Sequence, residues 1–183
     1  MSPSSILSII VAIVLLVILV VISISVSVFQ FYVFIVGHWK GAPFVPSSKK
    51  EIYAMLELAN IKPGEIVVDL GSGNGTILIE AARKGATVIG IEMNPFLIWY
   101  SRFRIKHLGL ANMITVYKGD LRDFPLECAD VVFLYLLPNT IANLREKLTR
   151  ELRKGSRVVS NSFPIPEWPV EAKKTVVYLY QKT

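Results

Sequence analysis

Charged side chains are missing from the first part of this 183-residue chain. Residues 1–39 contain no Asp, Glu, Lys or Arg, and Ile6–Val36 is an almost unbroken apolar run. All 20 basic and all 14 acidic residues follow from Lys40 onward, so the net charge of +6 belongs to the second part. The chain therefore divides into an apolar N-terminal segment and a basic remainder that is long enough for one compact domain.

Cysteine and histidine are scarce as well. The single cysteine, Cys128, excludes an intramolecular disulfide, and we expect it to be a buried thiol. The two histidines lie far apart in the sequence, and no spacing typical of a metal site is present. We therefore predict that the protein holds no metal.

The apolar run is longer than a bilayer requires, since about 20 apolar helical residues cross a hydrocarbon core of about 30 Å. It lacks the charged start, the short apolar region and the small-residue cleavage site of a secretory signal. We predict one retained transmembrane helix within residues 1–37. Two interpretations of its length remain open: a long tilted helix, or a span to about Val26 followed by an interfacial segment rich in serine and aromatic residues.

Basic residues follow the predicted span, at Lys40, Lys49 and Lys50, whereas no charged side chain precedes it. The positive-inside rule then predicts a single-pass membrane protein whose C-terminal domain is cytoplasmic and whose Met1 lies outside. Residues 38–47 contain Gly41, Pro43 and Pro46, and this composition predicts a short linker and loop. We predict that the domain proper comprises residues 48–183.

The centre of this domain is Val67–Thr76, where an apolar run ends on Asp69 and is followed by Gly71, Gly73 and Gly75. A strand, a glycine turn and a helix in this order form the first crossover of a Rossmann-like sheet. The spacing differs from the dinucleotide motif, and no Lys-Ser/Thr pair indicates a phosphate loop. A second apolar run ends on Glu92, 21 residues after Gly71, where a carboxylate can accept hydrogen bonds from two ribose hydroxyls. The combination favours an adenosyl cofactor.

Apolar runs alternate with helical patterns through the rest of the domain, which predicts an α/β fold with a mostly parallel sheet. A capping box at Ser48 begins a first helix, and Gly75–Lys84 and Pro95–His107 form two more. Asn139 can cap a fourth helix, which Gly155 closes. The predicted strands are Ile66–Leu70, Thr87–Glu92, Ile114–Lys118, Asp130–Tyr135, Arg157–Asn161 and Thr175–Tyr180.

Several strings in this framework resemble class I S-adenosylmethionine-dependent methyltransferases. Val68–Thr76, Gly90–Glu92 and Lys118–Leu121 look like motif I, the acidic position that follows it, and motif II. Longer strings resemble the membrane-anchored lysine methyltransferases that modify the mitochondrial ATP synthase c subunit and adenine nucleotide translocase, and the small archaeal protein-lysine methyltransferases. These strings are Pro43–Ser47, Glu92–Arg102, Leu144–Leu152 and Phe163–Trp168. The resemblance implies a Rossmann-like class I sheet with an antiparallel last strand and, because the preceding stretch is short, a shortened sixth strand.

The resemblance also implies how S-adenosylmethionine would be held. Gly71, Gly73 and Gly75 would line the methionine half, Glu92 would hold the ribose, and Asp120 would lie beside the adenine amino group. Phe44–Ser47 would cover the site. The remaining cofactor-binding positions that we expect are Pro46, Ser47, Asp69, Ser72, Met93, Asn94 and Leu121. Simpler interpretations are a strand-end cap for Asp120 and a surface acid for Glu92.

The acceptor side is expected at the end of the fourth predicted strand, where class I enzymes keep acceptor residues. Tyr135 is our candidate for the wall of a lysine channel, with Asn161 and Trp168 behind it, and we treat these three as the candidate catalytic residues. Tyr135 could instead be an ordinary packed tyrosine, and Trp168 could anchor the proline-rich loop around it. No residue is required as a general base, since the amine can lose its proton to water before transfer.

Three hypotheses about function follow. The first is a membrane-anchored protein-lysine methyltransferase that acts on membrane-associated proteins. The second is a methyltransferase for a lipid or another membrane-soluble small molecule, and the third is a cofactor-sensing adaptor without activity. No specific nucleic acid is expected, because Leu137-Pro138-Asn139 replaces the Asn-Pro-Pro-aromatic motif of nucleic-acid amino methyltransferases. The basic helix faces are explained by solvation or by anionic lipid.

Overall fold

The computed structural model describes residues 3–40 and 44–183, and the chain divides into the units Met1–Pro43 and Phe44–Thr183. The first unit holds one continuous helix, α1 (Pro3–Lys40), which runs through Val26 without a break. Its stretch Ile9–Tyr32 is long and apolar enough to cross a membrane, judged by length and composition alone. The helix extends three residues into the predicted linker, and Gly41–Pro43 of that linker lie outside the described residues.

Serine hydroxyls interrupt the apolar surface of α1 but find partners on the helix itself. Ser25 Oγ donates to the carbonyl of Val21 at 2.8 Å, and Ser27 Oγ donates to the carbonyl of Ser23 at 2.9 Å. These bonds to the preceding turn satisfy the hydroxyls without water. The serines are therefore compatible with an apolar environment.

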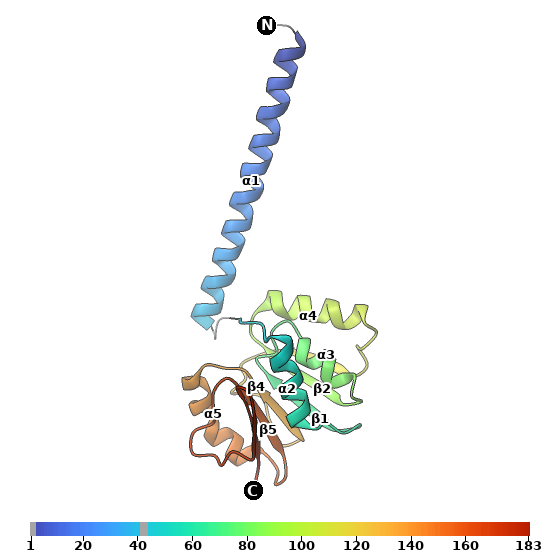
Figure 1. Ribbon diagram of the computed structural model, residues 1–183, viewed down its shortest axis with the longest axis vertical. Coiled ribbons are helices and arrows are strands. Elements are labelled where there is room, and N and C mark those ends of the chain that lie inside the picture. The colour runs from blue at the N-terminus through green and yellow to red at the C-terminus, as the bar shows by residue number, and fades with distance from the viewer. Residues whose placement is uncertain (1–2, 41–43) are drawn as a thin grey trace. The chain divides into compact units, whose positions relative to one another are not determined.

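Within the described residues, the second unit contains a seven-stranded sheet in the order β3-β2-β1-β4-β5-β7-β6. Figure 1 labels four of its strands, β1, β2, β4 and β5. Neighbouring strands from β3 to β5 are parallel, whereas β7 is antiparallel to both β5 and β6. The strands are β1 (Ile66–Leu70), β2 (Thr87–Glu92), β3 (Ile114–Lys118), β4 (Val131–Leu134), β5 (Arg157–Asn161), β6 (Ala172–Lys174) and β7 (Val177–Gln181). The predicted Rossmann-like sheet and its antiparallel last strand are confirmed, and β6 has three residues.

Helices cover both faces of the sheet because the parallel strands are apolar on both sides. On one face lie α2 (Lys49–Ala59), α3 (Thr76–Ala82) and α4 (Pro95–His107), which share a core with Val67 and Phe133. On the other face α5 (Pro138–Glu151) packs with Val68, Leu70 and the buried Tyr180. Alternate residues of one strand thus enter opposite cores, which fixes the strand register.

The start of α2 follows the capping box predicted from Ser48. The Ser48 hydroxyl accepts from the backbone N–H of Glu51, and the Glu51 carboxylate accepts from the backbone N–H of Ser48. Two helix-end donors are satisfied in this way. The first helix of the second unit therefore begins directly after the segment that carries Phe44.

Several local expectations were wrong. Asn139 does not cap α5; Leu137 is the N-cap and Pro138 takes the first helical turn, where its missing N–H costs nothing. Gly155 does not close the helix, which ends at Glu151 with Leu152 as its C-cap; Gly155 lies in the turn that follows. Cys128 is exposed rather than buried, since it lies in a surface turn before β4. Lys147, expected on a solvated face, is buried and paired with Glu151 at 2.5 Å.

Candidate cofactor and acceptor site

The glycine loop between β1 and α3 is held against the end of β2. The backbone N–H groups of Gly71 and Ser72 both donate to the carbonyl of Ile91, at 2.9 and 3.0 Å. Gly71, Gly73 and Gly75 all have positive φ, so the loop turns through conformations that favour glycine. The three predicted glycines thus form one tight turn at the carboxyl edge of the sheet.

Phe44 lies directly over this turn. A Cβ added at Gly73 would come within 2.5 Å of Phe44 Cε2, so the ring occupies the space that any side chain at this position would need. Pro46 and Ser47 continue the same segment, with Pro46 exposed and Ser47 half-buried, up to the Ser48 cap. The segment Phe44–Ser47 is therefore placed at the glycine loop, as a cofactor-covering loop would be.

Glu92 binds the glycine loop through its carboxylate. Oε2 accepts from the backbone N–H of Gly73 at 2.8 Å, and Oε1 accepts from the backbone N–H groups of Met93 and Asn94 at 2.9 and 2.8 Å. An ionised carboxylate offers about four acceptor positions, so one remains for a further donor. Glu92 is half-buried and is no simple surface acid. Its first role in the fold is to join the end of β2 to the loop.

Asp69 is buried at the end of β1, at the base of the glycine loop. Burial raises the pKa of Asp69 to about 7, and the nearby negative charge of Glu92 adds to the rise. A carboxyl group with this pKa changes its charge near neutral pH. Such a shift is typical of functional sites, although structural groups show it as well.

The other predicted cofactor residues follow the strands β2 and β3. Asn94 is the N-cap of α4, and its side chain accepts from the N–H groups of Phe96 and Leu97. Asp120 follows β3 and accepts hydrogen bonds from the backbone and guanidinium of Arg122, which hold the pKa of its carboxyl below the usual value. Leu121 packs against the core on the α5 side. Asn94 thus serves a helix end, and Asp120 has a cation as its partner.

The loop after β4 brings the predicted acceptor side to the glycine loop. A Cβ added at Gly71 would lie 3.1 Å from Leu136 Cδ2, so the residue after Tyr135 touches the glycine turn. Tyr135 and Asn161 directly follow the paired residues Leu134 and Ser160 on the adjacent strands β4 and β5. The carboxyl ends of three neighbouring strands therefore meet here, as they do at the ligand sites of open α/β sheets.

Two buried polar atoms at this edge have no hydrogen-bond partner among the described residues: Ser72 Oγ and Asn161 Nδ2. Asn161 is fully buried, and its Oδ1 accepts from Ser162 Oγ at 3.4 Å. Buried polar groups in proteins normally find partners. Spare hydrogen-bonding capacity next to a glycine turn is what a bound polar ligand would use.

Comparison with known proteins places this site in a family. The model of the ANTKMT methyltransferase domain matches residues 69–172, which is more than half of the chain. The chain belongs to this family. A protein-lysine N-methyltransferase of Saccharolobus islandicus is 36% identical over 148 residues, which cover 75% of this chain and 92% of that protein. The family predicted from the motifs is confirmed, and with it a domain of the S-adenosylmethionine-dependent methyltransferases.

Two further relatives are informative. The human lysine N-methyltransferase of the ATP synthase c subunit is 38% identical over 126 residues, covering 69% of this chain. The match covers 54% of that protein, so this chain spans about half the length of its mammalian relative. An RNA methyltransferase from Salinibacter ruber, solved with S-adenosyl-L-homocysteine, is 37% identical with a TM-score of 0.73, covering 75% of this chain and 93% of that one.

Trp168 lies apart from the other two candidate catalytic residues. Its indole N–H donates to Thr149 Oγ1 at 3.3 Å, and its ring meets Tyr180 edge-on at 6.1 Å. Tyr180 pairs with Val158, whereas Asn161 lies three residues further toward the carboxyl end of β5. The structure thus brings Tyr135 and Asn161 to one edge of the sheet but leaves Trp168 on the α5 side.

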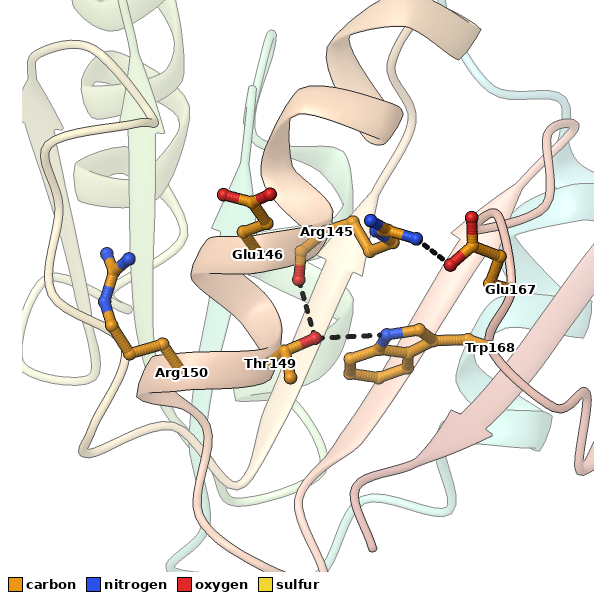
Figure 2. A pocket seen from close by; sticks show the side chains of 6 residues that line it. All are labelled: Arg145, Glu146, Thr149, Arg150, Glu167 and Trp168. Atoms are coloured by element: carbon orange, nitrogen blue, oxygen red, sulfur yellow. Dashed lines mark hydrogen bonds and ion pairs between the residues drawn. The ribbon is translucent and has the colours of Figure 1, made fainter.

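A shallow surface pocket of about 500 Å³ surrounds Trp168 (Figure 2). Arg145 of α5 forms an ion pair with Glu167 across it, and Thr149 of the same helix accepts the hydrogen bond from the indole. These contacts tie the proline-rich loop to α5. They favour the interpretation of Trp168 as an anchor of the proline-rich loop.

Arg104 is a site residue that the sequence did not reveal. Its guanidinium donates to the carbonyl of Asn74 at 2.7 Å and to Thr76 Oγ1 at 3.1 Å, so α4 holds the far end of the glycine loop. The sequence suggests a solvated face instead, because a run of arginines and lysines on one helix gives no sign of a partner 30 residues away. Gly90 was part of a recognised motif, but its role was not predicted: a Cβ there would lie 2.8 Å from Ser72 Oγ and 2.6 Å from Leu78 Cδ1.

Proposed function

We propose that this protein is a membrane-anchored protein-lysine N-methyltransferase that uses S-adenosylmethionine. The observation that carries the proposal is the contact between Gly71 and Leu136, which brings the glycine loop next to Tyr135 and Asn161. A methyl donor on the loop and an amine beside Tyr135 would then meet at one edge of the sheet. Relatives that are 35–38% identical and named for protein-lysine methylation support the choice of acceptor.

The residues present fit the cofactor. The carboxylate of Glu92 has an acceptor position left for a ribose hydroxyl, and ribose could also displace the N–H of Gly73 from Oε2. Asp120 could receive an adenine amino group if Arg122, which is mostly exposed, swings away. When bound, S-adenosylmethionine supplies an activated methyl group and leaves as S-adenosylhomocysteine.

On the acceptor side the protein has to position a neutral amine in line with the methyl group. The half-buried ring of Tyr135 offers an aromatic face for the lysine stem and ammonium group before the proton is lost to water. A half-turn of the Asn161 amide would present Oδ1, in place of the unpartnered Nδ2, to an amine N–H. Both residues act by orientation, and neither has to remove the proton.

Membrane attachment is the second part of the proposal. The stretch Ile9–Tyr32 can cross a bilayer, and a protein held there would meet lysines of other membrane proteins. The basic residues that follow the span favour a cytoplasmic domain.

The test is transfer of a labelled methyl group by the full-length protein to native membranes, followed by acid hydrolysis of the products. We expect methylated lysine. Tyr135→Leu, which removes the aromatic face, and Asn161→Ala should lower the rate, whereas Tyr53→Leu on exposed α2 should not. Label confined to the lipid extract would contradict a protein acceptor and favour the small-molecule alternative.

RNA is a second candidate acceptor, favoured by the likeness to the Salinibacter ruber RNA methyltransferase and by the net charge of +6. The sequence Leu137-Pro138-Asn139 argues against it. Nuclease treatment separates the two possibilities. Label that is lost with ribonuclease and kept with protease would overturn the lysine assignment.

A further inference from the structure

Helix α4 has two unlike faces. Leu97, Ile98, Ser101 and Ile105 are buried against the sheet. The opposite face is neither polar nor buried: it carries a row of aromatic rings at helical spacing. Trp99 and Phe103 are 61% and 58% exposed. The row consists of Phe96, Trp99, Tyr100, Phe103 and His107.

The rings of this aromatic row contact one another along the helix. Trp99 stacks on Phe103 with centroids 6.1 Å apart, and Phe103 stacks on His107 at 6.2 Å. At the other end Phe96 lies 5.9 Å from Trp99 and 6.3 Å from Tyr100. Mutual stacking orders the row but leaves its outer side in water, and such large exposed apolar surfaces mark interaction sites.

Basic residues flank the aromatic row, and α4 contains no acid. With 3.6 residues per turn, Arg102 and Lys106 fall on one side of the row and Arg104 falls on the other. Two of these cations also hold the domain together, since Arg102 donates to the carbonyl of Val116 and Arg104 to that of Asn74. Arg102 and Arg104 are thus fixed at the two borders of the aromatic row.

We propose that the outer face of α4 is a membrane-binding surface that lies in the headgroup region of an anionic bilayer. Aromatic side chains prefer this region, where their apolar bodies leave water and their polar tips stay hydrated. Flanking lysines and arginines are attracted to anionic lipid. A bilayer is a more suitable occupant than a protein groove because the same chain carries an apolar helix long enough to span one.

The consequence is a restricted orientation of the domain. The N-cap of α4, Asn94, lies two residues after Glu92 in the chain. Arg104, near the other end of α4, binds the far end of the glycine loop. Contact of α4 with the bilayer would therefore fix the glycine loop relative to the membrane surface, which a single covalent tether does not do. This inference is independent of which acceptor is methylated.

The experiment measures binding of a fragment, residues 44–183, to vesicles of phosphatidylcholine with and without phosphatidylserine. The fragment holds both hydrophobic cores, and the Saccharolobus relative consists almost entirely of the matching domain, so the fragment is a folding unit. The variants are Trp99→Ser with Phe103→Ser, and Lys106→Gln. The matched control is Tyr53→Ser, which removes an aromatic ring that is 75% exposed on α2.

We expect binding of the wild-type fragment to require phosphatidylserine and to weaken in salt. Lys106→Gln should weaken binding about fivefold, which corresponds to ~1 kcal/mol for one basic residue at the surface. The double serine variant should lose roughly tenfold or more, because two apolar rings no longer leave water. The Tyr53→Ser control should bind as the wild type does.

Three outcomes would overturn the proposal: no binding to anionic vesicles, equal binding of the double variant and the wild type, or an equal loss in the Tyr53→Ser control. Sedimentation velocity without lipid adds a further arm. If the wild-type fragment self-associates and the Trp99→Ser, Phe103→Ser variant does not, the aromatic row is a contact between two copies of the chain instead of a membrane-binding surface. Binding of S-adenosylhomocysteine to each variant shows that the variant is folded. If the wild-type fragment itself does not bind S-adenosylhomocysteine, that result counts against the proposed function and not against the membrane-binding surface.

Discussion

At the scale of single residues, Asp69 is the group whose environment departs most from the ordinary. Its pKa is about 7 in the folded domain, against an ordinary value of 3.8, chiefly because burial disfavours the charged form. The folded state therefore holds a proton that the unfolded chain has released between these two values. Stability must fall as pH rises through this window and level off above it.

This dependence gives a direct prediction for Asp69→Asn. From pH 5 to pH 8 the wild-type fragment 44–183 should lose roughly 3 kcal/mol of unfolding free energy, at about 1.4 kcal/mol per pKa unit. The asparagine variant has no group to titrate there, and its stability should change far less. Urea unfolding at the two pH values provides the measurement. The same loss in both proteins would mean that another group carries the effect.

Gly73 and Phe44 form the second residue-scale case. Gly73→Ala places a side chain where φ is +52° and where the Phe44 ring already lies, so the variant suffers backbone strain and a clash. Phe44→Ala removes the clash but leaves the strain, which costs about 1–2 kcal/mol for a residue other than glycine. We expect Gly73→Ala to weaken S-adenosylhomocysteine binding at least tenfold in the wild-type background. In the Phe44→Ala background the same substitution should weaken binding clearly less.

Calorimetry on the four proteins of this double-mutant cycle is the test. Coupling of about 1 kcal/mol or more would show that the ring and the loop act together. Strictly additive losses would mean that Phe44 is not a cover for the loop.

At the scale of elements, the sequence was a good guide wherever an apolar run ended on a polar residue. β1, β2, β3, β5 and α4 have the predicted bounds, because buried parallel strands are recognisable from local composition. β6 was not predicted as a strand with bounds, since Ala172-Lys-Lys174 has no apolar alternation and pairs with β7 as its one neighbouring strand among the described residues. β7 begins two residues later than expected because Thr175, with φ of +56°, belongs to the turn.

In the candidate site, too, local features were predicted from the sequence and long-range contacts were not. Glycines with special conformations and acids at strand ends can be recognised in a sequence, whereas pairings between distant elements cannot. Glu92 was found, but its bonds to the loop were not foreseen. Arg104 was missed because its partners, Asn74 and Thr76, are remote in the chain.

Arg104 leads to the prediction at this scale. Arg104→Met keeps the length of the side chain but removes two hydrogen bonds from a charged donor, each worth about 1.5–3 kcal/mol. We expect faster hydrogen exchange at the amides of residues 71–76 and weaker binding of S-adenosylhomocysteine. Arg83→Met, which breaks an exposed ion pair with Glu80, is the matched control and should change neither. If loop exchange is unchanged in Arg104→Met, α4 does not hold the loop.

At the scale of the whole molecule, the chain joins an apolar helix to a methyltransferase domain by a short connection. About a dozen residues separate Tyr32, the last residue of the possible span, from Phe44, the first residue of the domain unit. An extended chain covers at most ~3.3–3.6 Å per residue, so with Ile9–Tyr32 in a bilayer, as we propose, the domain would stay within roughly 40 Å of its surface. Such confinement would raise the effective concentration of the lysines in this layer without any new contact.

The anchor should therefore select substrates by their height above the membrane. The candidate cofactor and acceptor residues all lie in residues 44–183, so deletion of residues 1–43 should leave cofactor binding and the methylation of soluble peptides largely intact. The same deletion should sharply reduce methylation of lysines just above the membrane surface, because the enzyme is no longer concentrated there. The measurement is mass spectrometry of cells that carry the full-length or the truncated protein. It compares methylation, site by site, at membrane-proximal lysines and at lysines of soluble proteins. Replacement of residues 9–32 by an unrelated apolar span provides the control and should restore the membrane-proximal sites. An unchanged ratio of membrane-proximal to soluble sites after deletion would show that the helix does not select substrates, whatever else it contributes.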